Sequence, residues 1–187
     1  MTTRTDPQPT TRLSPDAAHT LTFQDYPPAA DITGVWLHIL KKQRSDNGFF
    51  MEYARFTGGN VENLPAPFEV RQLSVSRAEA GRVNAFHIHP NEPQNELWTV
   101  LDGQLKVWLI DLRAGSPTEG NRRAVILSGE EPVQLHIPAG VAHGYRAGPS
   151  GAVLLYSMDQ QFNLERPNEG RLPWDFFGPE LWAEDRG

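Results

Sequence analysis

The sequence predicts an all-β domain, built as a sandwich or barrel of short strands. Three observations lead to this fold class. Strand-like runs that alternate apolar and polar residues recur along the chain. Glycine and proline, with 16 residues each, divide the chain into short segments. No long segment repeats its apolar residues with a helical period, so short strands joined by close turns account best for the pattern.

The expected strands follow one another from residue 34 to residue 158. Half-buried strands place alternate side chains on opposite faces, which explains the alternation. Within the longest run, Asp102 and Gly103 predict a tight hairpin, because both residues tolerate the positive φ angles of a two-residue turn. The runs lie at 34–40, 48–56, 68–78, 83–89, 96–112, 123–128, 132–138 and 152–158.

The two ends of the chain differ in composition from the strand-rich part. Residues 1–25 are rich in Thr, Pro and Asp, which predicts a flexible N-terminal tail. Residues 26–187 are predicted to form one domain, including a C-terminal extension with two tryptophans and two phenylalanines. Because a free tail would expose that aromatic surface, we expect the extension to pack on the domain or on a partner.

Composition excludes several classes of partner and chemistry. The net charge of −6 gives no basic footprint, so we do not expect nucleic acid as a partner. The chain has no cysteine, so it has neither thiolate metal ligands nor a cysteine nucleophile. No apolar run approaches the ~18 residues of a membrane span. The N-terminal segment lacks the apolar core of a signal peptide, which predicts a cytoplasmic location.

A cluster of histidines with one glutamate predicts a metal site. Because side chains two apart share a strand face, His87 and His89 point the same way. Glu96 opens the next strand and can pair beside them, and His143 follows the turn at Pro138. Three imidazoles and one carboxylate are a plausible set of ligands for a divalent transition metal. The ligands do not distinguish Fe, Mn, Ni and Zn.

The spacing of these residues resembles the paired motifs of the cupin superfamily. Gly81 precedes His87-x-His89, and Glu96 and Gly103 follow at intervals of seven, while Pro138-x-Gly140 precedes His143. The resemblance implies a double-stranded β-helix, the cupin or jelly-roll barrel, that holds a metal with three histidines and one glutamate. The gap between His89 and Glu96 is longer than in the motif, which a longer loop can absorb.

A second resemblance covers residues 46–165 and points to the dTDP-4-dehydrorhamnose 3,5-epimerase family, itself cupin-shaped. That family epimerises a keto-sugar nucleotide without a metal. The resemblance implies that His87 is the catalytic base, that Tyr156 supplies the proton on the other face, that Asp111 is also catalytic, and that His143 belongs to the site. It also implies a homodimer in which 46–52 is exchanged between subunits. The matching pieces are 46–52, Gln72, 83–89, 107–120, 137–145 and 153–157.

The sequence departs from this family at chemical positions. The family has arginine at Asn84, lysine at Glu96 and a phosphate-contacting arginine at Asn47. Its histidine-orienting aspartate aligns with either Asp175 or Gly178. Losing these cations removes positive charge from a site meant for an anion, and Glu96 adds a metal ligand instead.

The two resemblances assign His87 two roles that exclude each other, since a metal ligand has already used the lone pair that a general base needs. Our leading hypothesis is a divergent, metal-containing relative of the epimerases that isomerises or epimerises a sugar-like carbonyl compound. Its small-molecule substrate, a sugar or sugar nucleotide, would contact Gln72, Asn84 and Trp98. The alternatives are an iron-dependent oxygenase and a non-catalytic binding cupin.

Overall fold

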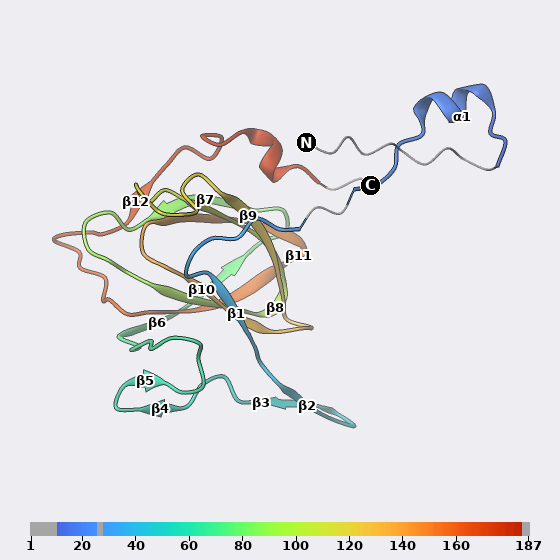
Figure 1. The fold of residues 1–187 in the computed structure, drawn as a ribbon. Coiled ribbons are helices and arrows are strands. Elements are labelled where there is room, and N and C mark those ends of the chain that lie inside the picture. The colour runs from blue at the N-terminus through green and yellow to red at the C-terminus, as the bar shows by residue number, and fades with distance from the viewer. Residues whose placement is uncertain (1–10, 26–27, 185–187) are drawn as a thin grey trace.

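A computed structural model describes residues 11–25 and 28–184 and confirms the all-β prediction (Figure 1). Most elements are strands, joined in antiparallel pairs. The strands are β1 (Trp36–Ile39), β2 (Lys42–Ser45), β3 (Gly48–Met51), β4 (Phe56–Thr57), β5 (Asn60–Val61), β6 (Gln72–Ala78), β7 (Val83–Ile88), β8 (Glu96–Asp111), β9 (Arg122–Ser128), β10 (Val133–Ile137), β11 (Val141–Met158) and β12 (Gly170–Arg171). The helical elements are α1 (Pro15–Thr20) and the 3-10 turn η1 (Pro179–Trp182).

Two long strands, β8 and β11, organise the fold. They pair with each other along most of their length. On the outer side of β8, β10 pairs with its first residues and β9 with its second half. On the outer side of β11, β7 pairs with the first half and β6 with the second. Each long strand therefore joins two antiparallel layers, with β1 beyond β10 and β12 beyond β7.

The hydrophobic core lies between these layers. Residues from both halves of β8 and β11 contribute to one cluster, together with Leu135 and Ile137 from β10 and Val125 and Leu127 from β9. Their side chains are almost completely buried. Burial of such side chains contributes roughly 1.5–3 kcal/mol each relative to exposure, which holds the layers in register.

The predicted hairpin at Asp102-Gly103 is wrong, because β8 continues through both residues. Gly103 has φ 73° inside the strand, and the pairing of β8 with β11 shifts register beside it. A Cβ on Gly103 would clash with the carbonyl oxygen of Gly151, which lies at the matching bend of β11. Gly103 supplies the positive φ for a bulge at which the strand bends, and the chain does not reverse its direction there.

We expect Gly103→Ala to lower the free energy of unfolding by about 3 kcal/mol or more, since it adds a steric clash to left-handed strain. Gly115→Ala is the matched control: Gly115 also has positive φ (77°), but a Cβ there meets nothing within 4 Å. Its loss should be about 1 kcal/mol. Urea denaturation of both variants measures the difference, and equal losses would contradict the close approach of the two strands.

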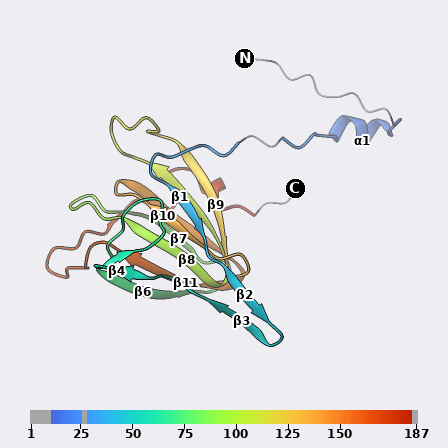
Figure 2. The same cartoon turned by 60° about the horizontal axis from the view of Figure 1, so that its bottom comes forward.

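The N-terminal segment lies apart from the strands. α1 is capped by Ser14, has no buried residue, and lies away from the sheet in both views (Figures 1 and 2). The described residues 11–25 are exposed, and residues 1–10 of the predicted tail lie outside the described part. The flexibility of this tail therefore stays a prediction. Neither helical element among the described residues has the length and apolarity needed to cross a membrane.

The aromatic C-terminal extension packs on the domain in part. Trp182 is buried against Phe86, with ring centroids 5.1 Å apart, and its indole N–H donates to the carbonyl of Trp174. Trp174 and Phe176 remain more than half exposed. The extension also supplies β12, which pairs with β7 and so closes one side of the site described below.

The β2–β3 hairpin projects from the other strands (Figures 1 and 2). Phe49 and Phe50 on this hairpin are 52% and 67% exposed. Burial of these exposed apolar side chains against a second subunit would be favourable. The predicted exchange of 46–52 between subunits stays a prediction.

Candidate active site

A cavity of about 410 Å³ opens between β6, β7, β8, β11 and β12. Most of the residues predicted for the site line it, which brings together positions between 72 and 156. They are Gln72, Asn84, His87, His89, Glu96, Trp98 and Tyr156. His143 lies against this set and is buried, with its ring centroid 6.0 Å from that of His87 and 5.7 Å from that of His89.

The shared face predicted for His87 and His89 agrees with the structure, with His87 on β7 and His89 just after its end. His87 and His89 line the cavity. Phe86, which points to the opposite face of β7, is completely buried in a separate apolar cluster with residues of the C-terminal extension. The strand register places His87 opposite His143 on β11. Alternation along one strand and pairing to the next are therefore sufficient to bring these imidazoles together.

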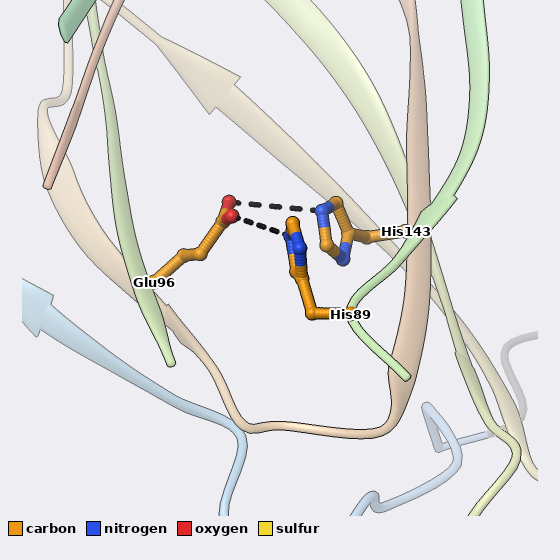
Figure 3. Close-up of side chains that lie close together, drawn as sticks. All are labelled: His89, Glu96 and His143. Atoms are coloured by element: carbon orange, nitrogen blue, oxygen red, sulfur yellow. Dashed lines mark ion pairs between the residues drawn. The ribbon is translucent and has the colours of Figure 1, made fainter. Parts of the chain in front are cut away.

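Glu96 gathers two imidazoles around its carboxylate, as Figure 3 shows. His89 Nε2 lies 2.8 Å from one carboxylate oxygen and His143 Nε2 lies 3.6 Å from the other. The indole N–H of Trp98 and the side-chain amide of Gln94 also donate to this carboxylate. The ligand atoms of the three clustered residues all lie within 4.8 Å of one another.

His87, the fourth expected ligand, is held outside this cluster. Its Nε2 lies 3.1 Å from Asn84 Oδ1, and its Nδ1 lies 3.4 Å from a carboxylate oxygen of Glu169. Arg171 of β12 is in register with His87, so the two side chains lie on the same face of the sheet, where both line the cavity. The structure thus separates a His89–Glu96–His143 cluster from a His87–Glu169 pair.

Burial and neighbouring charges set the protonation of these groups. Burial and the nearby His143 lower the pKa of His87 to about 4, so its imidazole is neutral near pH 7. Burial opposes the charged form of Glu96, but His143 and the hydrogen bond to His89 lower the pKa of Glu96 to about 2. Burial opposes the charged form of His89, but the hydrogen bond to Glu96 and its charge raise the pKa of His89 above its usual value. Burial lowers the pKa of His143.

Tyr156 and Gln72 occupy the β6–β11 side of the cavity. Tyr156 is in register with Ser74 of β6, and burial raises the pKa of its phenol. The amide of Gln72 donates to Ser74 Oγ at 3.3 Å and accepts from the backbone N–H of Phe162 at 2.7 Å. Trp98 lies between the two sides, 5.1 Å from the ring of His143 and 6.5 Å from that of Tyr156.

Asp111, expected to be catalytic, does not line the cavity. Its fully buried side chain accepts hydrogen bonds from Arg113, Ser116 and Thr118 at 2.7–2.8 Å. The hydrogen bonds from Arg113 hold the pKa of Asp111 well below its usual range. With both oxygens engaged, Asp111 fixes the loop after β8, and we do not retain the catalytic role.

The partner of His87 is also not the predicted one. Neither Asp175 nor Gly178 lines the cavity; both belong to a turn in which the Gly178 N–H donates to the Asp175 carbonyl. Glu169, immediately before β12, takes the place beside His87, and Arg171 of β12 lines the same cavity. Sequence reasoning missed both, since a strand of two residues leaves no periodic pattern.

Comparison with known proteins identifies the family. The model of the dTDP-4-dehydrorhamnose 3,5-epimerase family matches residues 29–176. The chain belongs to this family. A spore coat polysaccharide biosynthesis protein of Bacillus subtilis, SpsL, is 39% identical over 145 residues, covering 77% of this chain and 91% of the relative. A dTDP-4-dehydrorhamnose 3,5-epimerase of Neisseria gonorrhoeae is 33% identical over 129 residues, which are 68% of this chain and 39% of that longer protein.

Solved structures confirm the cupin-type jelly roll of this family member. The dTDP-6-deoxy-D-glucose-3,5-epimerase of Legionella pneumophila Philadelphia 1, solved with dTDP-4-keto-L-rhamnose, matches with a TM-score of 0.69 and 28% identity. The match covers 83% of this chain and 80% of that one. The family membership expected from the sequence is therefore confirmed. Membership supports sugar epimerisation as the general activity.

Proposed function

We propose that the chain epimerises a 4-keto sugar nucleotide at a carbon next to the carbonyl. The observation that carries the proposal is the neutral imidazole of His87, paired with Glu169, in the same cavity as the phenol of Tyr156. A base and an acid on different walls of one cavity suit removal of a proton from one face and its return to the other. The relative solved with dTDP-4-keto-L-rhamnose supports the class of substrate.

In this reaction His87 takes the proton as the C–H bond breaks, and the electron pair moves onto the carbonyl oxygen as an enolate. The substrate would replace the contact between His87 Nε2 and Asn84, while Glu169 holds Nδ1. Tyr156 then protonates the carbon from the other face, which inverts its configuration. Incubation with a dTDP-4-keto-6-deoxy sugar, followed by NMR of the product, tests the proposal; the absence of any epimer would contradict it.

The alkaline side of the pH profile tests the role of Tyr156. A proton donor must be protonated, and burial raises the pKa of this phenol above its usual value. A raised pKa extends the protonated form to higher pH. We therefore expect kcat/KM to show no alkaline decline below about pH 10, the usual value for a phenol. A decline centred near pH 8 in enzyme that is still folded would exclude Tyr156 as the acid.

As a second part of the proposal, His89, Glu96 and His143 would hold a divalent transition metal. Their surroundings fit one: His89 Nδ1 bonds the carbonyl of Asn168 at 2.8 Å, and His143 Nδ1 bonds that of Val141 at 3.0 Å. The bond from each Nδ1 to a backbone carbonyl turns Nε2 toward Glu96, which is the orientation of metal-binding histidines, and a bound metal would replace the proton that His89 Nε2 donates to Glu96. A bound metal would supply Lewis-acid stabilisation of negative charge on the substrate.

Elemental analysis of protein purified without added metal tests this second part. We expect about one equivalent of Fe, Mn, Ni or Zn per chain, because the ligands suit each of these ions. We also expect chelation to lower the melting temperature, since a ligand bound only to the folded state stabilises it. Metal-free protein with full epimerase activity would contradict the metal and leave the roles of His87 and Tyr156 intact.

The location and assembly of the protein remain part of the proposal. We infer a cytoplasmic homodimer in which the β2–β3 hairpin, with its exposed Phe49 and Phe50, packs on the second subunit. The comparisons give no support to the oxygenase or to the non-catalytic binding protein considered above.

A further inference from the structure

Arg171 closes a ring of contacts around His87. One guanidinium nitrogen donates to Glu169 Oε1 at 2.6 Å, and another donates to Asn84 Oδ1 at 3.4 Å. Those two acceptors are the groups that lie beside the two nitrogens of His87. Arg171 therefore contacts both partners of the imidazole at once.

The backbone holds this ring in place. Arg171 is in register with His87 across the β7–β12 pair, and Gly170 before it pairs with Ile88. The neighbouring Leu172 exchanges backbone hydrogen bonds with Phe86, which is completely buried. The end of the extension is anchored by Trp182, whose burial holds the segment on the sheet.

The other arginines that line the cavity are engaged differently. Arg77 of β6 forms an ion pair at 3.4 Å with Glu79, which lies just beyond the end of that strand. Arg82 lines the cavity just before β7, and no described contact joins its side chain to the partners of His87. Among the described cations of the cavity, Arg171 is the one placed to act on the base.

We propose that Arg171 is a positioning residue, which holds Glu169 beside Nδ1 of His87 and keeps Asn84 beside Nε2 until the substrate takes that place, and so fixes the orientation of the base. The proposal rests on the epimerase function proposed above. A guanidinium suits this task because its planar fork donates to two acceptors in fixed directions, whereas an ammonium is a point charge on a flexible stem. Losing such an orienting contact slows the chemical step more than it weakens binding.

Steady-state kinetics of Arg171→Ala and Arg171→Lys test the proposal. We expect Arg171→Ala to lower kcat by about 100-fold, the cost of a misplaced catalytic group, with little change in KM. Arg171→Lys should be intermediate, and added guanidinium ion should restore part of the activity of Arg171→Ala. Arg123→Ala is the control, since Arg123 lies on β9, pairs with Asp31 and does not line the cavity.

A second substitution separates positioning from other roles. If Arg171 acts through Glu169, then Glu169→Gln and Arg171→Ala should have a combined effect smaller than the product of the two. A raised KM with unchanged kcat in Arg171→Ala would assign Arg171 to substrate binding and overturn the proposal.

A crystal structure of Arg171→Ala provides a readout independent of turnover. The proposal expects the Glu169 and Asn84 side chains to leave His87, and unchanged contacts would overturn it. If the unmodified protein shows no turnover, the epimerase proposal fails, whereas this structural result still decides whether Arg171 positions the site.

Discussion

Replacing His87 with asparagine is expected to lower kcat/KM for epimerisation by about 100- to 10,000-fold, the range that a general base contributes. The physical reason is that no other described side chain combines a neutral imidazole with an orienting carboxylate in the cavity. His89 has a raised pKa and faces Glu96, and His143 is buried behind it. Neither can take over the proton from a substrate in contact with His87.

The control for this variant is His38→Asn. His38 lies on β1 and does not line the cavity, so its replacement should leave kcat/KM unchanged. Thermal unfolding of both variants shows whether each is folded. A folded His87→Asn protein with activity close to that of the unmodified protein would exclude His87 as the base.

Tyr156→Phe is expected to separate the two halves of the reaction. The variant keeps His87, so it should still exchange the substrate's acidic C–H hydrogen with solvent. It lacks the phenol that delivers a proton to the other face, so net epimerisation should fall by about 100-fold or more. NMR in deuterium oxide measures both: exchange with retained configuration, and formation of the epimer.

Tyr53→Phe is the matched control, because the Tyr53 hydroxyl lies 3.3 Å from Ser157 Oγ and this residue does not line the cavity. It should epimerise at the rate of the unmodified protein. Equal loss of exchange and epimerisation in Tyr156→Phe would assign Tyr156 to substrate binding or to the first proton transfer.

Local patterns in the sequence predicted much of the site. The two-residue period of a strand predicted the shared face of His87 and His89, and the spacing to Glu96 and His143 predicted their approach. These inferences succeed because period and pairing are properties of short segments. The family resemblance added Tyr156, which the structure places in the same cavity.

The remaining features depend on contacts between distant segments. Glu169 and Arg171 reach His87 only because the C-terminal extension folds back and pairs with β7. Asp111 matched the family in sequence, but its three neighbouring donors engage it away from the cavity. The Asp102-Gly103 dipeptide is compatible with a hairpin or a bulge, and its pairing with β11 decides between them.

The most direct test of the account follows deuterium from solvent into a dTDP-4-keto-6-deoxy sugar incubated with the purified, metal-supplemented protein. The account predicts enzyme-dependent incorporation at a carbon adjacent to the carbonyl, with inversion at that carbon, and loss of both in His87→Asn. A folded protein that incorporates no deuterium above the enzyme-free rate would contradict it.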